Sequence, residues 1–436
     1  MMLANITSVA GVIGGSCLSG NIFSLIAIKL GAQEIYLGIL NFAVIAPYIF
    51  GLFTLSAIET IGKKKILFSW FLVSSFLCIP FLFIENIINF YQPNTAAVLN
   101  ILIVLILLRA ITASLASTAW FPLLQDIIPV EETGRFFGKL RTSWQLANFI
   151  FLLAIGLYLG KEPTFKQFQG VFIIAVVAHF IRTYLVGQMT DARVYSPKKR
   201  KFDTVKRISE VITSQTFKNV GWYISAYAFS ASMFAPFVIK MIKDFGYGDG
   251  LIVAATAMAS LGAITTLNFW GYLTDKFGNR AVFSISTIGM VLVTLGWVFV
   301  HKGTFGIVLI FVLFFLSNAF ISGNGIAQTR FFFNNLPSDK SHFIVILSTI
   351  PVFVMAFGPL LGGFFLKYTQ SVNFTIFNFN INNYKLFFII NGLLFLIPHI
   401  LRKKLRLPEE TPTSQVIAMM TKPLKNIIQP FLRPPV

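Results

Sequence analysis

Twelve long apolar runs, separated by short polar connections, constrain the fold of this chain more than any other feature of its sequence. They fall near residues 8–30, 35–58, 66–88, 97–123, 142–160, 169–190, 219–240, 250–274, 281–301, 305–329, 342–367 and 383–401. A helix needs about 20 apolar residues to cross the hydrocarbon core of a bilayer, so each run is long enough to span it. We therefore predict an all-α integral membrane protein with about twelve transmembrane helices.

The composition excludes most other classes of protein. Of the 436 residues, 56% are hydrophobic and 12% are charged, whereas a soluble chain is about 25% charged. So few charges cannot cover a water-soluble core, which argues against a soluble enzyme. Two Cys and four His argue against a disulfide framework and a transition-metal site. Since no nucleophile–base pair or phosphate-binding loop is evident, we expect no enzymatic activity, no cofactor and no metal.

Lys and Arg are distributed unevenly among the connections. The net charge of +19 could suggest a nucleic-acid partner, but the basic residues lie in short segments between apolar runs, so we expect none. The N-terminus, the even-to-odd connections and the C-terminal segment hold 25 of the 35 basic residues, and the opposite connections hold 8. The positive-inside rule then predicts a multi-pass protein of the inner or plasma membrane with both termini in the cytoplasm.

The longest internal polar stretch, residues 191–219, divides the chain into two halves with six runs each. We predict a six-helix bundle over 1–190, a cytoplasmic linker over 191–218 and a second bundle over 219–403. A cytoplasmic tail over 404–436 has too few apolar residues to span and is suited to lie on the membrane surface. The Asn-rich stretch 370–383 is predicted to be a flexible loop.

The connections after the second and eighth runs repeat one another. Shifting GYLTDKFGNR by 216 residues aligns an acid, a glycine and a base in the two copies. A tight turn between helices favours Gly, an acid can accept hydrogen bonds from a helix N-terminus, and a nearby base can pair with that acid. We predict that these residues gate the cytoplasmic side, with solvated helix-end charge pairs as the alternative. They are Glu59, Gly62 and Lys64 in the first copy and Asp275, Gly278 and Arg280 in the second.

These motifs resemble the major facilitator superfamily. GYLTDKFGNR matches that family's loop signature Gly-x-Leu-x-Asp-x-x-Gly-x-Arg, whereas the first copy has Leu55 and Glu59 in place of Gly and Asp. LLRAITASLAS is similar to the family's fourth-helix arginine motif at Arg109, and FGPLLGG at 357–363 is like an element of family antiporters that usually lies on helix five. The resemblance implies two pseudo-symmetric six-helix bundles that work by alternating access, with the first and fourth helices of each half lining the cavity.

One charge lies deep inside a run that the resemblance places at the cavity. Arg109 is about 12 residues into the fourth run, or about 18 Å of helix rise from its outer end, and no Asp or Glu occupies the middle of any run. A guanidinium group suits a carboxylate, phosphate or sulfonate. We predict that Arg109 anchors the solute, with a packing role for its side chain as the alternative.

The other predicted solute-binding residues are polar and neutral, and they are spread over several runs. As single residues they could equally serve as packing contacts between helices, but as a set they favour a water-accessible site. They are Thr112, Gln145, Asn148, Tyr227, Asn318, Asn324 and Gln328. His179 and Arg182 share one face of the sixth run, where we expect a packed histidine and an arginine that reaches the membrane surface.

We therefore predict a secondary transporter that moves a small polar or anionic organic solute by alternating access. Its partners are that solute and the lipid bilayer, and the sequence leaves open whether a coupling ion takes part. Two alternatives stay open. The Phe-rich helices would suit efflux of an amphipathic drug or lipid, and the chain could be a non-transporting membrane scaffold or sensor that retains a carrier fold.

Overall fold

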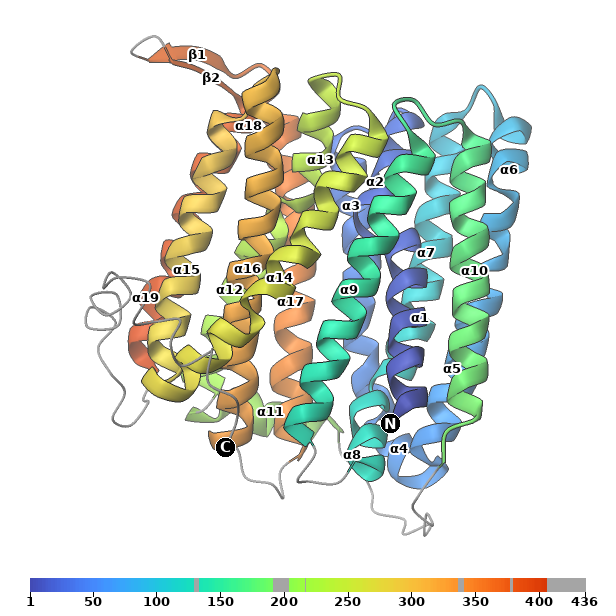
Figure 1. Cartoon of the computed structure of the whole chain (residues 1–436), viewed down its shortest axis with the longest axis vertical. Helices are drawn as coiled ribbons and strands as arrows, with labels where there is room; N and C mark the ends of the chain where they lie inside the picture. The colour runs from blue at the N-terminus through green and yellow to red at the C-terminus, as the bar shows by residue number, and fades with distance from the viewer. Residues whose placement is uncertain (129–132, 191–203, 216, 336–340, 377–378, 406–436) are drawn as a thin grey trace.

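The structure is a computed structural model that describes residues 1–128, 133–190, 204–215, 217–335, 341–376 and 379–405. Within these residues, twelve helical segments are long and apolar enough to cross a membrane. Figure 1 shows them as a bundle of roughly parallel helices. The predicted fold class is thus confirmed.

The helices of the first half occupy residues 2–187. They are α1 (Met2–Leu18), α2 (Gly20–Lys29), α3 (Glu34–Ile45), η1 (Ala46–Thr54), α4 (Leu55–Ile61), α5 (Lys63–Phe76), η2 (Ile79–Phe83), α6 (Ile84–Tyr91), α7 (Thr95–Ser117), α8 (Trp120–Ile127), α9 (Thr133–Leu159) and α10 (Phe165–Gly187).

The second half follows a helix, α11 (Thr204–Thr213), that lies within the predicted linker. Its elements are η4 (Phe217–Gly221), α12 (Trp222–Met233), α13 (Ala235–Asp244), α14 (Asp249–Phe277), α15 (Asn279–Gly296), η5 (Trp297–Phe299), α16 (Thr304–Asn335), α17 (Ser341–Tyr368), β1 (Asn373–Ile376), β2 (Phe379–Asn382), α18 (Asn383–Leu394), α19 (Leu396–Leu401) and η6 (Arg402–Lys404). Most of the predicted tail, from residue 406 onward, lies outside the described residues.

The bundle has an upper and a lower end in the view of Figure 1. The upper end carries β1 and β2, and the lower end carries the N-terminus of the chain. The predicted loop at 370–383 is wrong in part, because residues 373–376 pair antiparallel with residues 379–382. Phe374 and Ile376 alternate with polar residues, which is the two-residue period of a strand.

The first span is built from two helices in succession. Helix α1 ends at Leu18, and Ser19 is extended with φ of −147°. Gly20 then has φ of 64°, a left-handed conformation that glycine adopts without a steric penalty. Helices α1 and α2 together give one span of 28 residues with an interruption in its upper part.

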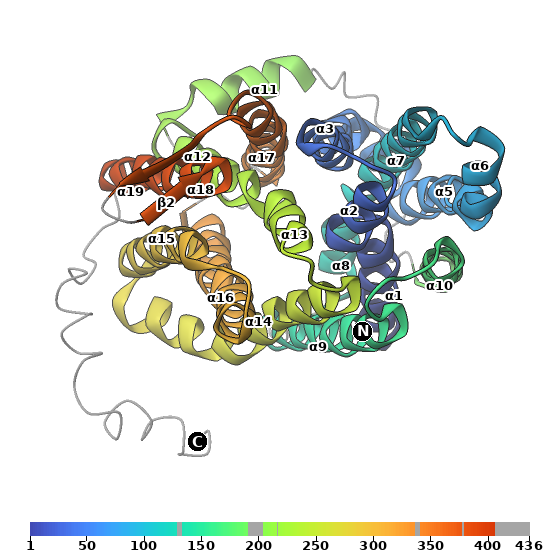
Figure 2. The same ribbon diagram turned by 90° about the horizontal axis from the view of Figure 1, so that it is seen from above.

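The two halves meet along two pairs of helices. From above, helices α1–α10 lie on one side of the molecule and α12–α19 on the other (Figure 2). Helix α3 packs against α17, and α9 packs against α14. Glycines permit the close approach, because a Cβ on Gly38 would lie 2.6 Å from the Pro359 carbonyl oxygen and a Cβ on Gly156 would lie 2.7 Å from that of Gly250.

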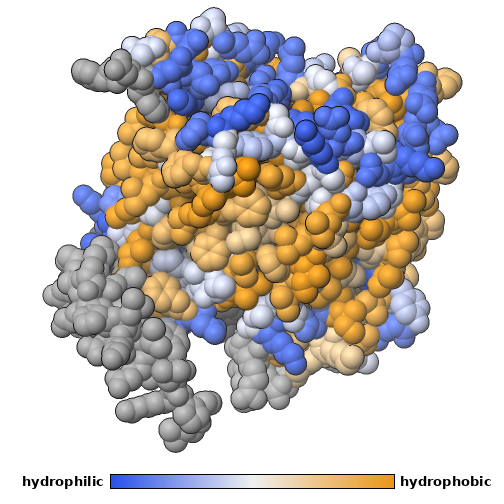
Figure 3. Space-filling model, turned by 45° about the horizontal axis from the view of Figure 1, so that its top comes forward, coloured by the Kyte–Doolittle hydropathy of each residue, from blue (hydrophilic) through white to orange (hydrophobic). Residues whose placement is uncertain are grey.

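The surface matches a bilayer environment. Figure 3 shows a broad hydrophobic belt below a hydrophilic rim at the upper end. Large apolar side chains are exposed, such as Phe53, Leu157 and Phe299, at 66%, 86% and 60%. Exposed apolar surface of this extent is typical of contact with lipid or with another protein.

Candidate solute-binding site

A polar contact joins the two halves near the middle of helices α9 and α14. The Asn148 side-chain amide donates to Ser260 Oγ at 2.8 Å, and Ser16 Oγ donates to Asn148 Oδ1 at 2.6 Å. Ser16 and Asn148 belong to the first half and Ser260 to the second. We call these three side chains the mid-height contact; it links α1, α9 and α14.

The face of α9 below Asn148 carries further polar groups. Gln145 lies one turn away and is partly buried, with no hydrogen bond to any described residue. The neighbouring Trp144 has a buried Nε1 without a partner among the described residues. One turn beyond Gln145 on the same helix, Arg141 donates to Thr329 Oγ1 of α16 at 3.1 Å and so forms a second bond between the halves.

Arg141 and Ser260 take part in these contacts between the halves, although the sequence pattern did not indicate them. Arg141 directly precedes the fifth apolar run at 142–160, so the sequence pattern puts it in a connection. Helix α9, however, begins at Thr133, and the membrane-length segment already includes Arg141. The spacing of Arg141, Gln145 and Asn148 by four and three residues is the available signal, since such residues share a helix face.

Three of the predicted residues of the second half form or adjoin a buried hydrogen-bonded group. Asn324 is 0% exposed and its amide donates to Tyr223 Oη at 2.5 Å. The Gln328 amide donates to Asn324 Oδ1. Tyr227 lies one turn from Tyr223, and its buried hydroxyl has no partner among the described residues. Asn318, further up α16, is partly buried.

Arg109 and Thr112 make their side-chain contacts inside the first half. Arg109 Nη1 lies 3.3 Å from His179 Nε2 of α10, and the Thr112 hydroxyl donates to the Arg109 carbonyl oxygen of its own helix at 2.9 Å. Both side chains are 7% exposed. The structure therefore brings the predicted residues together in three places, which are the mid-height contact, the core of the first half and the core of the second.

The upper end is closed by contacts between the halves. The first two N–H groups of α14 donate across the interface, Asp249 to the Lys161 carbonyl at 3.1 Å and Gly250 to the Gly160 carbonyl at 2.6 Å. These are N–H groups that a helix cannot satisfy internally. Beside α3, the Tyr384 hydroxyl lies 3.1 Å from a Glu34 carboxylate oxygen.

The Tyr384 hydroxyl contacts two carboxylates at once. It lies 3.1 Å from Asp244 Oδ2 as well as from Glu34. The Gln370 amide is 3.4 Å from the other Glu34 oxygen, while Lys240 neutralises Asp244 at 2.5 Å. Glu34 comes from the first half and the other four side chains come from the second. We call these five residues the upper contact.

A sequence profile of the Major Facilitator Superfamily matches residues 223–436. The nucleoside transporter NupG superimposes with a TM-score of 0.66 at 12% identity, over 93% of this chain and 100% of that one. The second half of the chain therefore matches the Major Facilitator Superfamily by sequence.

Two further solved structures of transporters share the fold. A D-xylose-proton symporter gives a TM-score of 0.64 at 14% identity, over 95% of this chain and 98% of that one. A bacterial homologue of the iron transporter ferroportin, in an outward-facing state, gives 0.62 at 12% identity, over 92% and 98% of the two chains. No curated protein sequence matches this chain. At such low identities the similarity establishes the fold alone.

The predicted gate residues occupy the two loops of the Superfamily signature at the lower end. Gly62 and Gly278 have φ of 105° and 84°, and each precedes a new helix directly, as expected for a turn that only glycine adopts easily. Asp275 is 81% exposed and lies 3.6 Å from Arg330 of α16. Arg280 lies in the first turn of α15. The side chain of Glu59 is outside what the structure describes.

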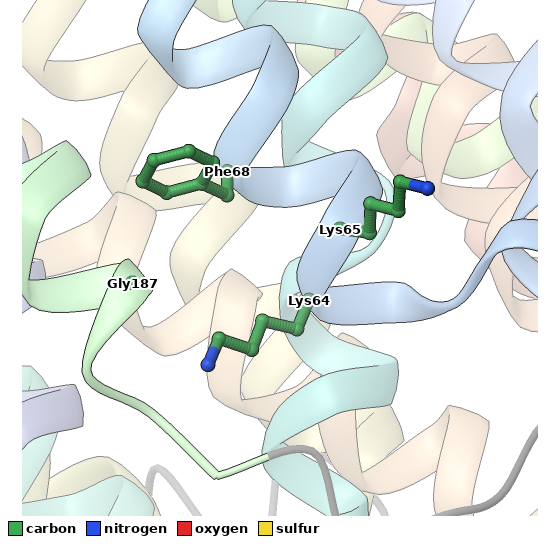
Figure 4. A pocket seen from close by; sticks show the side chains of 4 residues that line it. All are labelled: Lys64, Lys65, Phe68 and Gly187. Atoms are coloured by element: carbon green, nitrogen blue, oxygen red, sulfur yellow. The ribbon is translucent and has the colours of Figure 1, made fainter.

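In the first copy of the signature, Lys63 forms the ion pair. Its Nζ lies 2.5 Å from Asp126 of α8 and donates to the Pro122 carbonyl at 3.0 Å. Lys64 instead borders an open depression of about 330 Å³ together with Lys65, Phe68 and Gly187. Figure 4 shows the Lys64 and Lys65 side chains extending in different directions from the start of α5.

Metal binding has no support in the residues that the structure describes, where no group of three or more His, Cys, Asp or Glu side chains could hold an ion. Cys17 and Cys78 are both free and fully buried.

Proposed function

We propose that the protein is a secondary transporter, and not an enzyme, that carries a small polar solute by alternating access. The observation that supports this proposal most directly is the mid-height contact of Ser16, Asn148 and Ser260. Substrate sites of such folds lie near the bilayer midplane, at the interface of the two repeats. A polar contact between the halves at this height is suited to become the solute site when the halves separate.

The groups of the mid-height contact can exchange partners. An amide and a hydroxyl each both donate and accept hydrogen bonds, so a solute hydroxyl can replace Ser260 on Asn148 without leaving a buried polar atom unpaired. Gln145 is available on the same face of α9. We assign the remaining predicted residues to the walls of the same solute path. They are Tyr227, Asn318, Asn324 and Gln328 in the second half, with Arg109 and Thr112 behind the wall of the first.

The two ends of the bundle supply the gates of this proposal. The upper contact closes the upper end in the present conformation. At the lower end, the two signature loops with Glu59, Gly62, Lys64, Asp275, Gly278 and Arg280 act as the second gate. Because most Lys and Arg of the connections belong to lower-end loops, we place the lower end and both termini in the cytoplasm of an inner or plasma membrane.

The test is solute exchange by the purified full-length protein in proteoliposomes. Vesicles are loaded in turn with a nucleoside, a pentose, a dicarboxylate or inorganic phosphate, and uptake of the same labelled compound is measured. At least one class should exchange. Asn148→Leu should abolish that exchange, because it removes both hydrogen bonds of the mid-height contact.

Asn41→Leu is the matched control. The Asn41 amide donates only to the Leu37 carbonyl oxygen of its own helix, so this variant should keep the exchange rate of the wild type. Both variants must elute as monodisperse protein. If no solute class exchanges, the protein is not the proposed transporter, and if the two variants behave alike, the mid-height contact is not the solute site.

A further inference from the structure

The core of the first half contains two buried arginines beside a buried histidine, and neither arginine has a counter-charge among the described residues. Arg109 on α7 is 7% exposed and His179 on α10 is 5% exposed. Arg182 lies one turn further along α10, and its Nε is buried. Both guanidinium groups interact electrostatically with the His179 ring and with each other. We call Arg109, His179 and Arg182 the cation cluster.

Helix α1 is shaped to accommodate this cluster. A Cβ on Gly11 would lie 2.9 Å from Arg182 Nε, and a Cβ on Gly14 would lie 3.0 Å from His179 Cδ2. Real Cβ atoms essentially never approach a neighbour closer than this. The two glycines therefore give α1 a flat face against which both side chains fit, and Arg182 turns into the bundle rather than toward the membrane surface as its position in the sixth run suggested.

The partners that orient the two guanidinium groups are electrically neutral. An arginine can only donate hydrogen bonds, so His179 Nε2 accepts the bond from Arg109 at 3.3 Å and that nitrogen carries no proton. The Arg182 guanidinium carbon lies 3.8 Å above the centre of the Phe71 ring, a cation–π contact. The Nε atoms of both arginines lack a partner among the described residues.

The carboxylates of the first half that the structure describes take part in other contacts or belong to the upper end of the bundle (Figure 1). Glu34 belongs to the upper contact and Asp126 pairs with Lys63 at the lower end. Glu85 is in the first turn of α6, and Glu162 is an exposed residue of the upper connection after α9. Two buried cations inside a membrane bundle are costly without an opposite charge.

We propose that Arg109 and Arg182 bind one oxyanion group, a carboxylate or a phosphate, inside the first half. Guanidinium groups present planar pairs of N–H donors that match the oxygens of such groups. The assignment of this anion to the transported solute rests on the proposed function, and it makes the solute a small organic acid or phosphate ester.

The site is tested by titrating the purified full-length protein with inorganic phosphate and with succinate, against chloride at equal ionic strength. Heat of binding gives the affinity. The histidine ring signals in a spectrum of protein labelled at its four histidines give the location, with His179→Gln identifying the His179 signal. Phosphate or succinate should shift the His179 signal and leave the others in place.

The variants Arg109→Gln and Arg182→Gln should each weaken anion binding by about 10- to 100-fold, the effect of losing one charge-assisted hydrogen bond. Arg109→Lys and Arg182→Lys keep the charge, so they should fold as the wild type and bind with an intermediate affinity. Lys29→Gln is the matched control, since Lys29 is also a cation above an aromatic ring of the same half, 5.2 Å from the centre of Phe165, but at the upper end.

The source of the oxyanion is separated by the lipid used. In nanodiscs of neutral phosphatidylcholine, a solute-type site binds succinate or phosphate. If phosphatidylglycerol nanodiscs suppress that binding and shift the His179 signal themselves, a lipid headgroup occupies the cluster.

The proposal is overturned if the wild type binds none of these anions in either lipid, or if both glutamine variants bind them as the Lys29→Gln control does. These outcomes are independent of the exchange assay. Anion binding without any exchange would refute the proposed transport function but support the oxyanion site. Exchange of a neutral solute without anion binding would support transport and refute the oxyanion site.

Discussion

Removing one hydroxyl group should loosen the closed upper end of the protein. In Tyr384→Phe, Glu34 loses a hydrogen bond of 3.1 Å and keeps the Gln370 amide at 3.4 Å as its described partner. Because Glu34 is only 8% exposed, little water can replace the lost bond in the closed conformation. Water solvates Glu34 once the halves separate, so the loss falls mainly on the closed conformation.

The size of the effect follows from the charge on the acceptor. A hydrogen bond to a charged group contributes about 1.5–3 kcal/mol. One hydroxyl has a single proton to share between Glu34 and Asp244, so the lower value, about 1.5 kcal/mol, is appropriate. That energy corresponds to a change of about tenfold in the ratio of open to closed protein.

The opening can be measured by the labelling rate of a cysteine at the interface. Ala254 of α14 is suitable, because its Cβ would lie 3.2 Å from a Cβ on Gly156 of the other half, while Cys17 and Cys78 are buried and should react slowly. When opening and closing are fast, the rate of maleimide reaction at Ala254→Cys is proportional to the open population. Tyr384→Phe should raise that rate about tenfold.

Tyr247→Phe provides a matched control at the same end. The Tyr247 hydroxyl donates to the Gly303 carbonyl at 3.0 Å and accepts from the Gly303 amide at 2.9 Å, and both residues belong to the second half. This variant should leave the labelling rate unchanged. Equal rates for the two tyrosine variants would refute a role for Tyr384 in holding the halves together.

Three further outcomes are expected. Gly250→Val should speed labelling at the interface and stop exchange, because its Cβ would lie 2.2 Å from a carbonyl oxygen of the first half. Gly138→Ala, whose Cβ would meet no atom within 4 Å, should do neither. A Gly250→Val protein with normal exchange would contradict the close packing. Asp275→Asn and Glu59→Gln should slow exchange with little loss of folded protein, and wild-type rates in both would exclude the loops as gates. A cysteine introduced within 198–207 should resist impermeant reagents in intact cells, whereas its labelling from outside would reverse the assigned orientation.

The spans were predictable because the bilayer imposes one length on all of them. The twelve apolar runs coincide with twelve membrane-length helical segments. The turns at Gly62 and Gly278 were predictable for a related reason, since a sharp turn between two helices requires a positive φ and few residues other than glycine adopt it.

The contacts between helices were not predictable from the same patterns. Glu34 and Tyr384 are 350 residues apart in the sequence, and their contact depends on how α3 and the second half pack. The pairing of β1 with β2, by contrast, joins segments only two residues apart in the sequence, and the alternation of Phe374 and Ile376 with polar residues was the available signal. Asn148 was identified by its polarity inside a run, but its partner Ser260 is one of many serines in apolar helices.

The cation cluster lies within one half of the molecule, so it can bind an anion without taking part in the movement of one half against the other. A ligand shifts a conformational equilibrium only through contacts that differ between the two states. Arg109, His179 and Arg182 all belong to one half, so we expect their affinity for an anion to be the same whichever end of the bundle is open. Asn148 with Ser260, and Arg141 with Thr329, join different halves, so separation of the halves in the proposed cycle would break these two bonds.

It follows that the two sets of residues affect transport differently. The cluster raises the affinity of both conformations for the anion by the same factor. Such uniform binding lowers the solute concentration needed for half-maximal exchange, but it does not speed the conformational change. Arg182→Gln should therefore raise the solute concentration for half-maximal exchange and leave the maximal rate nearly unchanged. Ser260→Ala should change the maximal rate more than the half-maximal concentration, because Asn148 then loses a hydrogen bond that exists only while the halves are in contact.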